Sequence, residues 1–258
     1  MSTTHPVPIV RYSPINPVPA RRVGLRDPFR WLSNGWQSFA ANWKPALVFG
    51  TVFAASGAAI SLFAFSSPQL VFAFWSGFLL IAPILSMAIY HLALRHDRRE
   101  TTSMRHYGKM LAGNATNSLL LTLLLALIMV AWIRTSTLVT AIYAGNLGSG
   151  FDLSGGLSSV DTIGLLIVLS AVGAVFAIAT FSLLAWSMPM LARGRTDPVT
   201  AMVSSVRAVV TQPVPMLLWG GLVATLTLAS MATFFVAFVV VFPWLGFATW
   251  QAYQDLFE

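Results

Sequence analysis

The sequence predicts an all-α protein, a polytopic bundle of transmembrane helices. Hydrophobic residues make up 57% of the 258 residues and charged residues only 9%, whereas about a quarter of the residues of a soluble domain are charged. A charge-free run extends from Ala208 to Gln254. Because about 20 apolar residues span a bilayer as a helix, this run can hold two spans folded back on each other. No stretch of the chain demands a particular chemistry, so the sequence indicates architecture more clearly than function.

We expect six spans arranged as three hairpins, each preceded by an amphipathic helix at the membrane interface. Asp27-Pro28 is expected to start the first of these helices, because Asp can cap free backbone N–H groups and Pro suits the first helical position, and Asp197-Pro198 restarts the pattern. In the first such helix, apolar residues recur at steps of three and four and place tryptophan rings at headgroup depth; they are Phe29, Leu32, Trp36, Phe39 and Trp43. The expected spans cover about residues 45–65, 70–94, 116–138, 162–190, 214–232 and 235–255.

The three hairpins are interpreted as pseudo-repeats within one membrane domain, residues 27–258. A shift of 170 positions aligns Asp27-Pro28 with Asp197-Pro198, and the same shift aligns Gly50 with Gly220. We expect the repeats to cover residues 27–94, 99–192 and 197–256 and to enter the membrane from the same side, as parallel repeats.

The positions of the charges predict the topology. Lys and Arg concentrate in segments 11–44, 95–109 and 193–207, and none occurs in 66–69 or 139–160. By the positive-inside rule both termini are cytoplasmic, and the protein is expected in the inner membrane of a bacterium. The net charge of +7 is assigned to this orientation, and no nucleic-acid partner is expected. Residues 1–26 are rich in proline and arginine and predict a disordered cytoplasmic tail.

Arg134 is the strongest candidate for a functional residue, because a charge within a span is energetically costly and by default suggests a function. Asp152 and Asp161, on the outer side, are the available partners. The other interpretation, which we favour, is structural: Arg134 lies near the outer interface and can extend its charge to it.

Prolines and small residues within the spans predict how the helices pack. Pro83, Pro189 and Pro243 are expected to bend their helices, because each removes a backbone hydrogen bond. Small residues at steps of four predict close approach of helix backbones; they are Gly50, Ala54 and Ala58 in the first span and Gly173 and Ala177 in the fourth.

We expect no cofactor, no metal and no enzymatic activity. The chain has no cysteine, and its histidines, apart from the marginal candidate His91, are predicted at the cytoplasmic surface and not within spans, where haem ligands would lie. No Asp or Glu is predicted inside a span except at its ends, and no phosphate-binding, dinucleotide-binding or HExxH motif is present.

The chain resembles a bacterial family of predicted integral membrane proteins, domain of unknown function 2189. The resemblance depends on Trp31-Leu32 with Gly35-Trp36, on Val206-Arg207-Ala208-Val209 and on Phe242-Pro243-Trp244-Leu245-Gly246. It implies a membrane bundle and supplies no catalytic residues.

Two functions therefore remain open, with a third more distant. The first is a non-enzymatic accessory, assembly or scaffold factor that packs against other membrane proteins or against itself within the bilayer. The alternative is a small-solute or lipid transporter or channel whose pathway runs between the repeats. A lipid-modifying enzyme would need a catalytic constellation on one membrane face, and none is visible.

Overall fold

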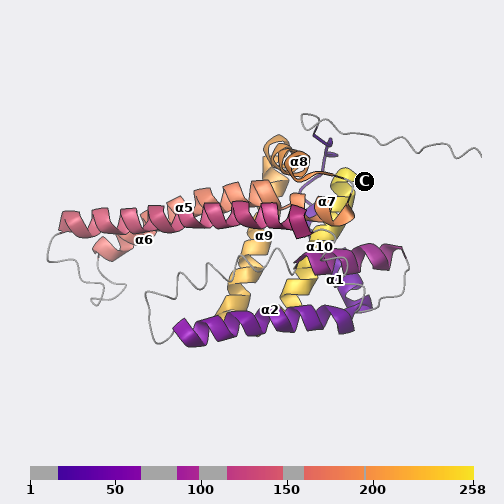
Figure 1. Ribbon diagram of the computed structural model, residues 1–258, viewed down its shortest axis with the longest axis horizontal. Coiled ribbons are helices and arrows are strands. Elements are labelled where there is room, and N and C mark those ends of the chain that lie inside the picture. The colour runs from indigo at the N-terminus through magenta and orange to yellow at the C-terminus, as the bar shows by residue number, and fades with distance from the viewer. Residues whose placement is uncertain (1–16, 65–85, 99–114, 148–159, 195) are drawn as a thin grey trace, which may run out of the picture.

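Figure 1 shows the computed structural model of the chain. It describes residues 17–64, 86–98, 115–147, 160–194 and 196–258, and all regular secondary structure in these residues is helical. The helices are α1 (Asp27–Ala41), α2 (Trp43–Ala64), α5 (Ala115–Leu147), α6 (Val160–Leu184), α7 (Ser187–Arg193), α8 (Pro198–Thr211), α9 (Pro213–Ala232) and α10 (Phe238–Phe257). Residues 86–97 are also helical.

Four of the described helical segments are long and apolar enough to cross a membrane, and they match four of the six expected spans. They are Trp43–Leu62, Leu119–Ile142, Ile163–Arg193 and Pro213–Ala232. The expected span 70–94 lies largely outside the described residues. The expected span 235–255 corresponds to α10, which is helical but is not among the four. Its C-terminal half carries Gln251, Gln254 and Asp255, which lower its mean hydropathy. The count of six spans stays a prediction.

Helix α10 is the central packing element of the described chain. Among the described helices it contacts α1 and α2 most extensively, and it also contacts α9 and α7. In Figure 1, α2 and the α5–α6 pair lie on opposite sides of the picture, with α9 and α10 running between them. The approach of α1 is close because Gly35 lies on the backbone of α10, where a Cβ at position 35 would be 2.5 Å from the Cα of Ala248.

Pro243 lies inside α10 and explains how closely α2 can approach. Because proline has no N–H, the carbonyl of Val239, four residues earlier, loses its helical hydrogen bond. Gly50 of α2 lies against this carbonyl and against the Pro243 ring, and a Cβ at position 50 would overlap the Val239 oxygen. The small residue thus lets two helix backbones meet where one of them has a free acceptor, as expected for Gly50 from the sequence.

Four tryptophans are fully buried where the helices converge: Trp31, Trp186, Trp219 and Trp250. The Trp31 ring makes edge contacts with Trp186, at 6.2 Å between ring centroids, and with Trp219, at 5.6 Å. Residues from α1, from the α6–α7 junction and from α9 therefore share one aromatic core.

Two aspartates connect this core to the polar end of the bundle. The Trp31 Nε1 and Arg30 Nη2 groups both donate to Oδ2 of Asp255, at 2.7 and 2.6 Å. The hydrogen bond from Arg30 to Asp255 raises the pKa of Arg30 above its ordinary value. The Trp250 Nε1 group donates to Oδ2 of Asp97 at 2.7 Å. The carboxylates thus satisfy indole N–H groups of two buried tryptophans and fix α1 and the helix 86–97 to α10.

The two Asp-Pro sequences begin helices in different ways. Asp197 caps α8 as expected, since its Oδ1 accepts from the N–H groups of Val199 and Thr200 at 3.0 Å. Burial opposes ionisation of Asp197, but these hydrogen bonds outweigh it and its pKa is lowered. The expectation that Asp27 caps α1 is wrong: Asp27 is the first helical residue, and its side chain accepts from the N–H of Gly24 at 2.6 Å.

Residues 17–26, which we expected to be part of a disordered tail, make hydrogen bonds across the bundle. Val18 N–H donates to Ser204 Oγ, Val23 N–H donates to Gln212 Oε1, and Arg21 N–H donates to the Leu256 carbonyl. The segment therefore joins α8 to the end of α10. Residues 1–16 lie outside the described residues.

The contact between Gly50 and α10 can be tested by adding one methyl group. Gly50→Ala should lower the free energy of unfolding by about 1–3 kcal/mol, because the methyl group overlaps backbone and overpacks the contact. Gly220→Ala is the matched control, since a Cβ there would meet the Phe181 ring at an ordinary 3.5 Å. Unfolding of the purified proteins in mixed detergent micelles measures both changes. Equal stability of the two variants would contradict the packing described.

Candidate functional site

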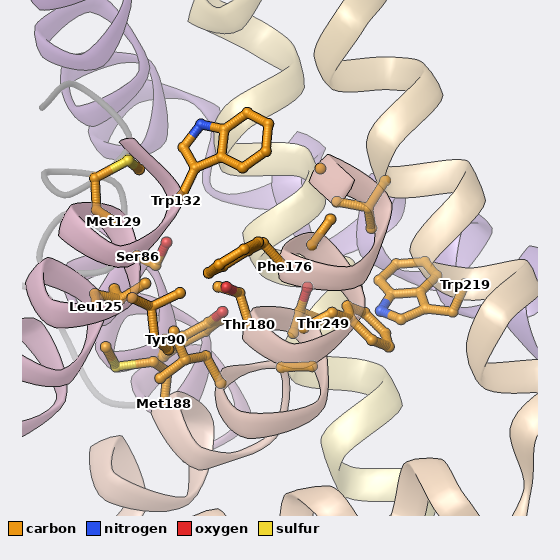
Figure 2. A pocket seen from close by; sticks show the side chains of 17 residues that line it. Ser86, Tyr90, Leu125, Met129, Trp132, Phe176, Thr180, Met188, Trp219 and Thr249 are labelled. Atoms are coloured by element: carbon orange, nitrogen blue, oxygen red, sulfur yellow. The ribbon is translucent and has the colours of Figure 1, made fainter. Parts of the chain in front are cut away.

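An apolar cavity of about 570 Å³ lies where the described segments of the chain converge. Its walls come from the helix 86–97 and from α5, α6, α7, α9 and α10. Figure 2 shows these side chains, which are mainly aliphatic and aromatic. No charged residue is among the described residues that line it. A cavity of this size lies within the range of about 300–1,000 Å³ that is typical of ligand sites.

The wall formed by α5 and α6 is aromatic. Trp132 of α5 and Phe176 of α6 meet edge to face, with 5.7 Å between ring centroids. Gly173 leaves room for the Trp132 ring, because a Cβ at position 173 would lie 3.2 Å from it. Gly173 and Ala177, which we expected at a close contact of helix backbones, both line the cavity.

Four hydroxyl groups interrupt the apolar lining: those of Ser86, Tyr90, Thr180 and Thr249. The Tyr90 hydroxyl interacts with those of Thr249 and Ser86, and Thr249 donates to the carbonyl of Leu245 at 2.8 Å. In Figure 2 the Tyr90 and Thr180 oxygens lie toward the centre of the cavity. These groups can orient a ligand through hydrogen bonds, but they include no carboxylate or imidazole for acid–base chemistry.

The break between α6 and α7 lies beside the cavity and is bridged by a serine from α8. Helix α6 ends at Leu184, and α7 begins at Ser187, two residues before Pro189. The Ser205 hydroxyl accepts from the N–H of Trp186 at 3.2 Å and donates to the carbonyl of Ser182 at 2.7 Å. These two backbone groups would bond to each other in an uninterrupted helix. Ser205 is thus inserted into the broken hydrogen-bond ladder.

The other residues predicted from the sequence that the structure describes do not line the cavity. Arg134 is exposed on α5. Its predicted partner Asp152 and the side chain of Asp161 lie outside what the structure describes, so this pairing stays a prediction. Pro83 also lies outside the described residues. His91 is buried, at 2% exposure, and neither ring nitrogen has a hydrogen-bond partner among the described residues. Within the described residues no three potential metal ligands gather.

Sequence reasoning missed the cavity hydroxyls and Ser205. Serine and threonine in membrane helices usually bond to a carbonyl one turn earlier in their own helix, so their presence alone carries little information. The available signal was Pro189, which predicts a freed carbonyl in the preceding turn. It does not indicate which helix supplies the compensating group.

The bridge can be tested with Ser205→Ala. This change leaves the Trp186 N–H and the Ser182 carbonyl buried without their partner, which should lower the free energy of unfolding by about 1–3 kcal/mol. Hydrogen exchange at the Trp186 amide should become faster. Thr225→Ala is the control, because the Thr225 hydroxyl bonds to Gly221 of its own helix and is exposed. Unchanged exchange at Trp186 in Ser205→Ala would overturn the assignment.

Comparisons with known proteins agree with a membrane bundle. Neither the curated proteins nor the solved structures contain a match to this chain. The model of one family, described as predicted integral membrane protein (DUF2189), matches residues 70–192. This region includes the helix 86–97, α5 and α6, whereas the cavity residues Trp219, Val223 and Thr249 lie beyond it. Over residues 70–192, this integral membrane protein is thus similar to the DUF2189 family of predicted integral membrane proteins.

Proposed function

We propose that the protein is a non-enzymatic accessory or scaffold factor that packs against another membrane protein through the outer face of α5. The observation that carries this proposal is an apolar stripe on α5 with an arginine in it. Its exposed members recur at steps of three and four along one face of the helix; they are Leu123, Leu127, Val130, Arg134 and Leu138.

The position of α5 supports this role. Helix α5 packs mainly against α6, with smaller contacts to α7 and α8. In Figure 1 the α5–α6 pair extends away from α1, α7 and α10. On a helix with 3.6 residues per turn, Arg134 lies opposite the cavity residues Leu125, Met129 and Trp132. Among the described residues, the stripe therefore faces away from the cavity, and in this proposal it meets a helix of another protein.

Arg134 supplies the specificity in this proposal. The described span Leu119–Ile142 extends further beyond Arg134 than the expected span 116–138, so Arg134 lies deeper than the sequence indicated. An arginine in the centre of a span costs about 2.5–3.5 kcal/mol on insertion scales. A partner helix that offers a carboxylate or a carbonyl to Arg134 would reduce this cost while its side chains pack along the stripe. Apolar packing along the stripe would not by itself distinguish one partner helix from another. The charge of Arg134 would select the partner that offers a matching polar group.

The proposal includes the orientation and the internal repeat. We place the protein in a bacterial inner membrane with both termini cytoplasmic, as the basic segments indicate. The burial of the two interfacial helices supports the repeat, because buried positions of α1 recur 170 residues later in α8. The pairs are Trp31 with Ala201, Gly35 with Ser205, and Phe39 with Val209.

The test is co-purification of tagged protein from its own membranes in a mild detergent. Wild type and Arg134→Lys should retain one constant partner, and Arg134→Leu should retain about tenfold less, equivalent to about 1.4 kcal/mol. A photo-crosslinking residue at Leu127 should trap this partner, whereas one at the exposed Leu62 of α2 should not. A monodisperse protein without partners, or equal recovery in Arg134→Leu, would count against the proposal.

A second candidate is a carrier of lipids or small apolar solutes, and the uncharged cavity favours it. The cavity is formed by segments of all three proposed repeats, so movement of one repeat against the others would change its access. This role predicts substrate-dependent flux in reconstituted vesicles, and Ala177→Trp, which fills the cavity, should abolish the flux. Equal flux in this variant would exclude transport through the cavity.

A further inference from the structure

We propose that the cavity binds the acyl chain of an ester-linked phospholipid, with the ester group near Trp219 and Thr180 and the chain extending toward Trp132. This inference concerns the cavity alone and does not require that the protein pack against a partner.

The lining excludes ions and charged solutes as ligands. No described residue of the wall carries a charge, and a buried charge without a partner is strongly unfavourable. A free fatty acid would bring a carboxylate into the same environment. An esterified chain has the same hydrocarbon surface without this charge, and the phosphate of its lipid can remain in the headgroup layer.

The hydroxyl groups separate into two sets. Tyr90 interacts with both Ser86 and Thr249, and Thr249 also bonds to backbone. By contrast, the Thr180 hydroxyl and the Trp219 indole N–H have no hydrogen bond to a described residue. Both residues line the cavity. Two donors without acceptors suit a ligand that brings acceptor oxygens, as a carboxylic ester does.

The arrangement of the walls gives the ligand a direction. Trp219 belongs to the buried tryptophan core, where it contacts Trp31 near the polar end of the bundle. From there the cavity follows α6 from Leu184 to Gly173, about 16 Å of helix at about 1.5 Å per residue. The far end is formed by Trp132 and Phe176 and is apolar (Figure 2). A chain anchored at Trp219 would therefore run toward the middle of the membrane.

The favourable free energy of lipid binding comes from shape complementarity and from hydrogen bonds. Lipid tails are as apolar as the cavity, so transfer of a chain between them has little hydrophobic driving force. Aromatic rings and methyl groups packed around one chain gain dispersion contacts over ordinary lipid. The lipid should accordingly exchange with the bilayer and still be retained in a mild detergent.

The experiment uses the full chain in nanodiscs that contain a phosphatidylcholine with a diazirine on one acyl chain. Mass spectrometry of the irradiated protein should locate adducts at cavity residues such as Phe176 and Met129, enriched at least about fivefold over the exposed Leu127. Ala177→Trp should remove this enrichment. Val175→Trp is the matched control, because Val175 lies on the same helix and is 66% exposed. Thermal unfolding of each variant confirms that it is folded.

A second pair of probes tests the ester. Trp219→Phe combined with Thr180→Val should reduce cavity labelling by the ester-linked probe about threefold to tenfold and leave labelling by an ether-linked analogue unchanged. A diazirine fatty acid should label the cavity less than the ester does. Adducts spread evenly over exposed residues, or cavity labelling that survives Ala177→Trp, would overturn the proposal. Equal loss of both probes in the double variant would overturn the assignment of the ester.

Discussion

The constraint on which this structure depends is that backbone polar groups inside a membrane find no water and must be satisfied by the protein. Two prolines within the helices each leave one backbone carbonyl without its helical hydrogen-bond donor. Pro243 removes the donor that would serve the Val239 carbonyl, and Pro189 does the same for the carbonyl of Ala185. At the first, Gly50 of α2 lies directly against the Val239 carbonyl. At the second the helix breaks, and Ser205 bridges neighbouring backbone groups.

The two solutions leave different amounts of space. Where a glycine lies directly on a proline-containing helix, α2 and α10 meet without a gap. At the α6–α7 break the compensation comes from α8, on one side only, and Gly220 of α9 faces the Phe181 ring at ordinary contact distance. The cavity occupies this second location, bordered by Phe181 and Trp219. A tight contact is therefore found where a glycine lies on the proline-containing helix, and the cavity lies beside the helix break that Ser205 bridges from one side.

The sequence predicted what depends on local pattern. Hydropathy located four spans to within a few residues. Of the apolar stripe predicted for the first interfacial helix, Phe39 is buried, whereas Phe29, Trp36 and Trp43 are exposed, and Trp31 and Gly35 lie on the buried face instead. The cap at Asp197 also follows from local chemistry. One error is local: Asp27 accepts from the N–H of Gly24 instead of capping α1. The other concerns contacts between distant residues, because residues 17–26 bind α8 and α10 through their backbone. A polar, proline-rich composition carries no signal for such contacts, because the partners are 180 or more positions away.

Helix α5 connects the two proposed roles. One face, with Leu125, Met129 and Trp132, lines the cavity, and the opposite face carries Arg134. Because both faces belong to one rigid helix, a displacement of α5 by a bound chain is transmitted to the Arg134 stripe without an intermediate element. A partner that holds the stripe would in turn hold one wall of the cavity. Lipid binding and partner binding would then be coupled reciprocally, since any ligand that prefers one position of α5 favours every other ligand with the same preference.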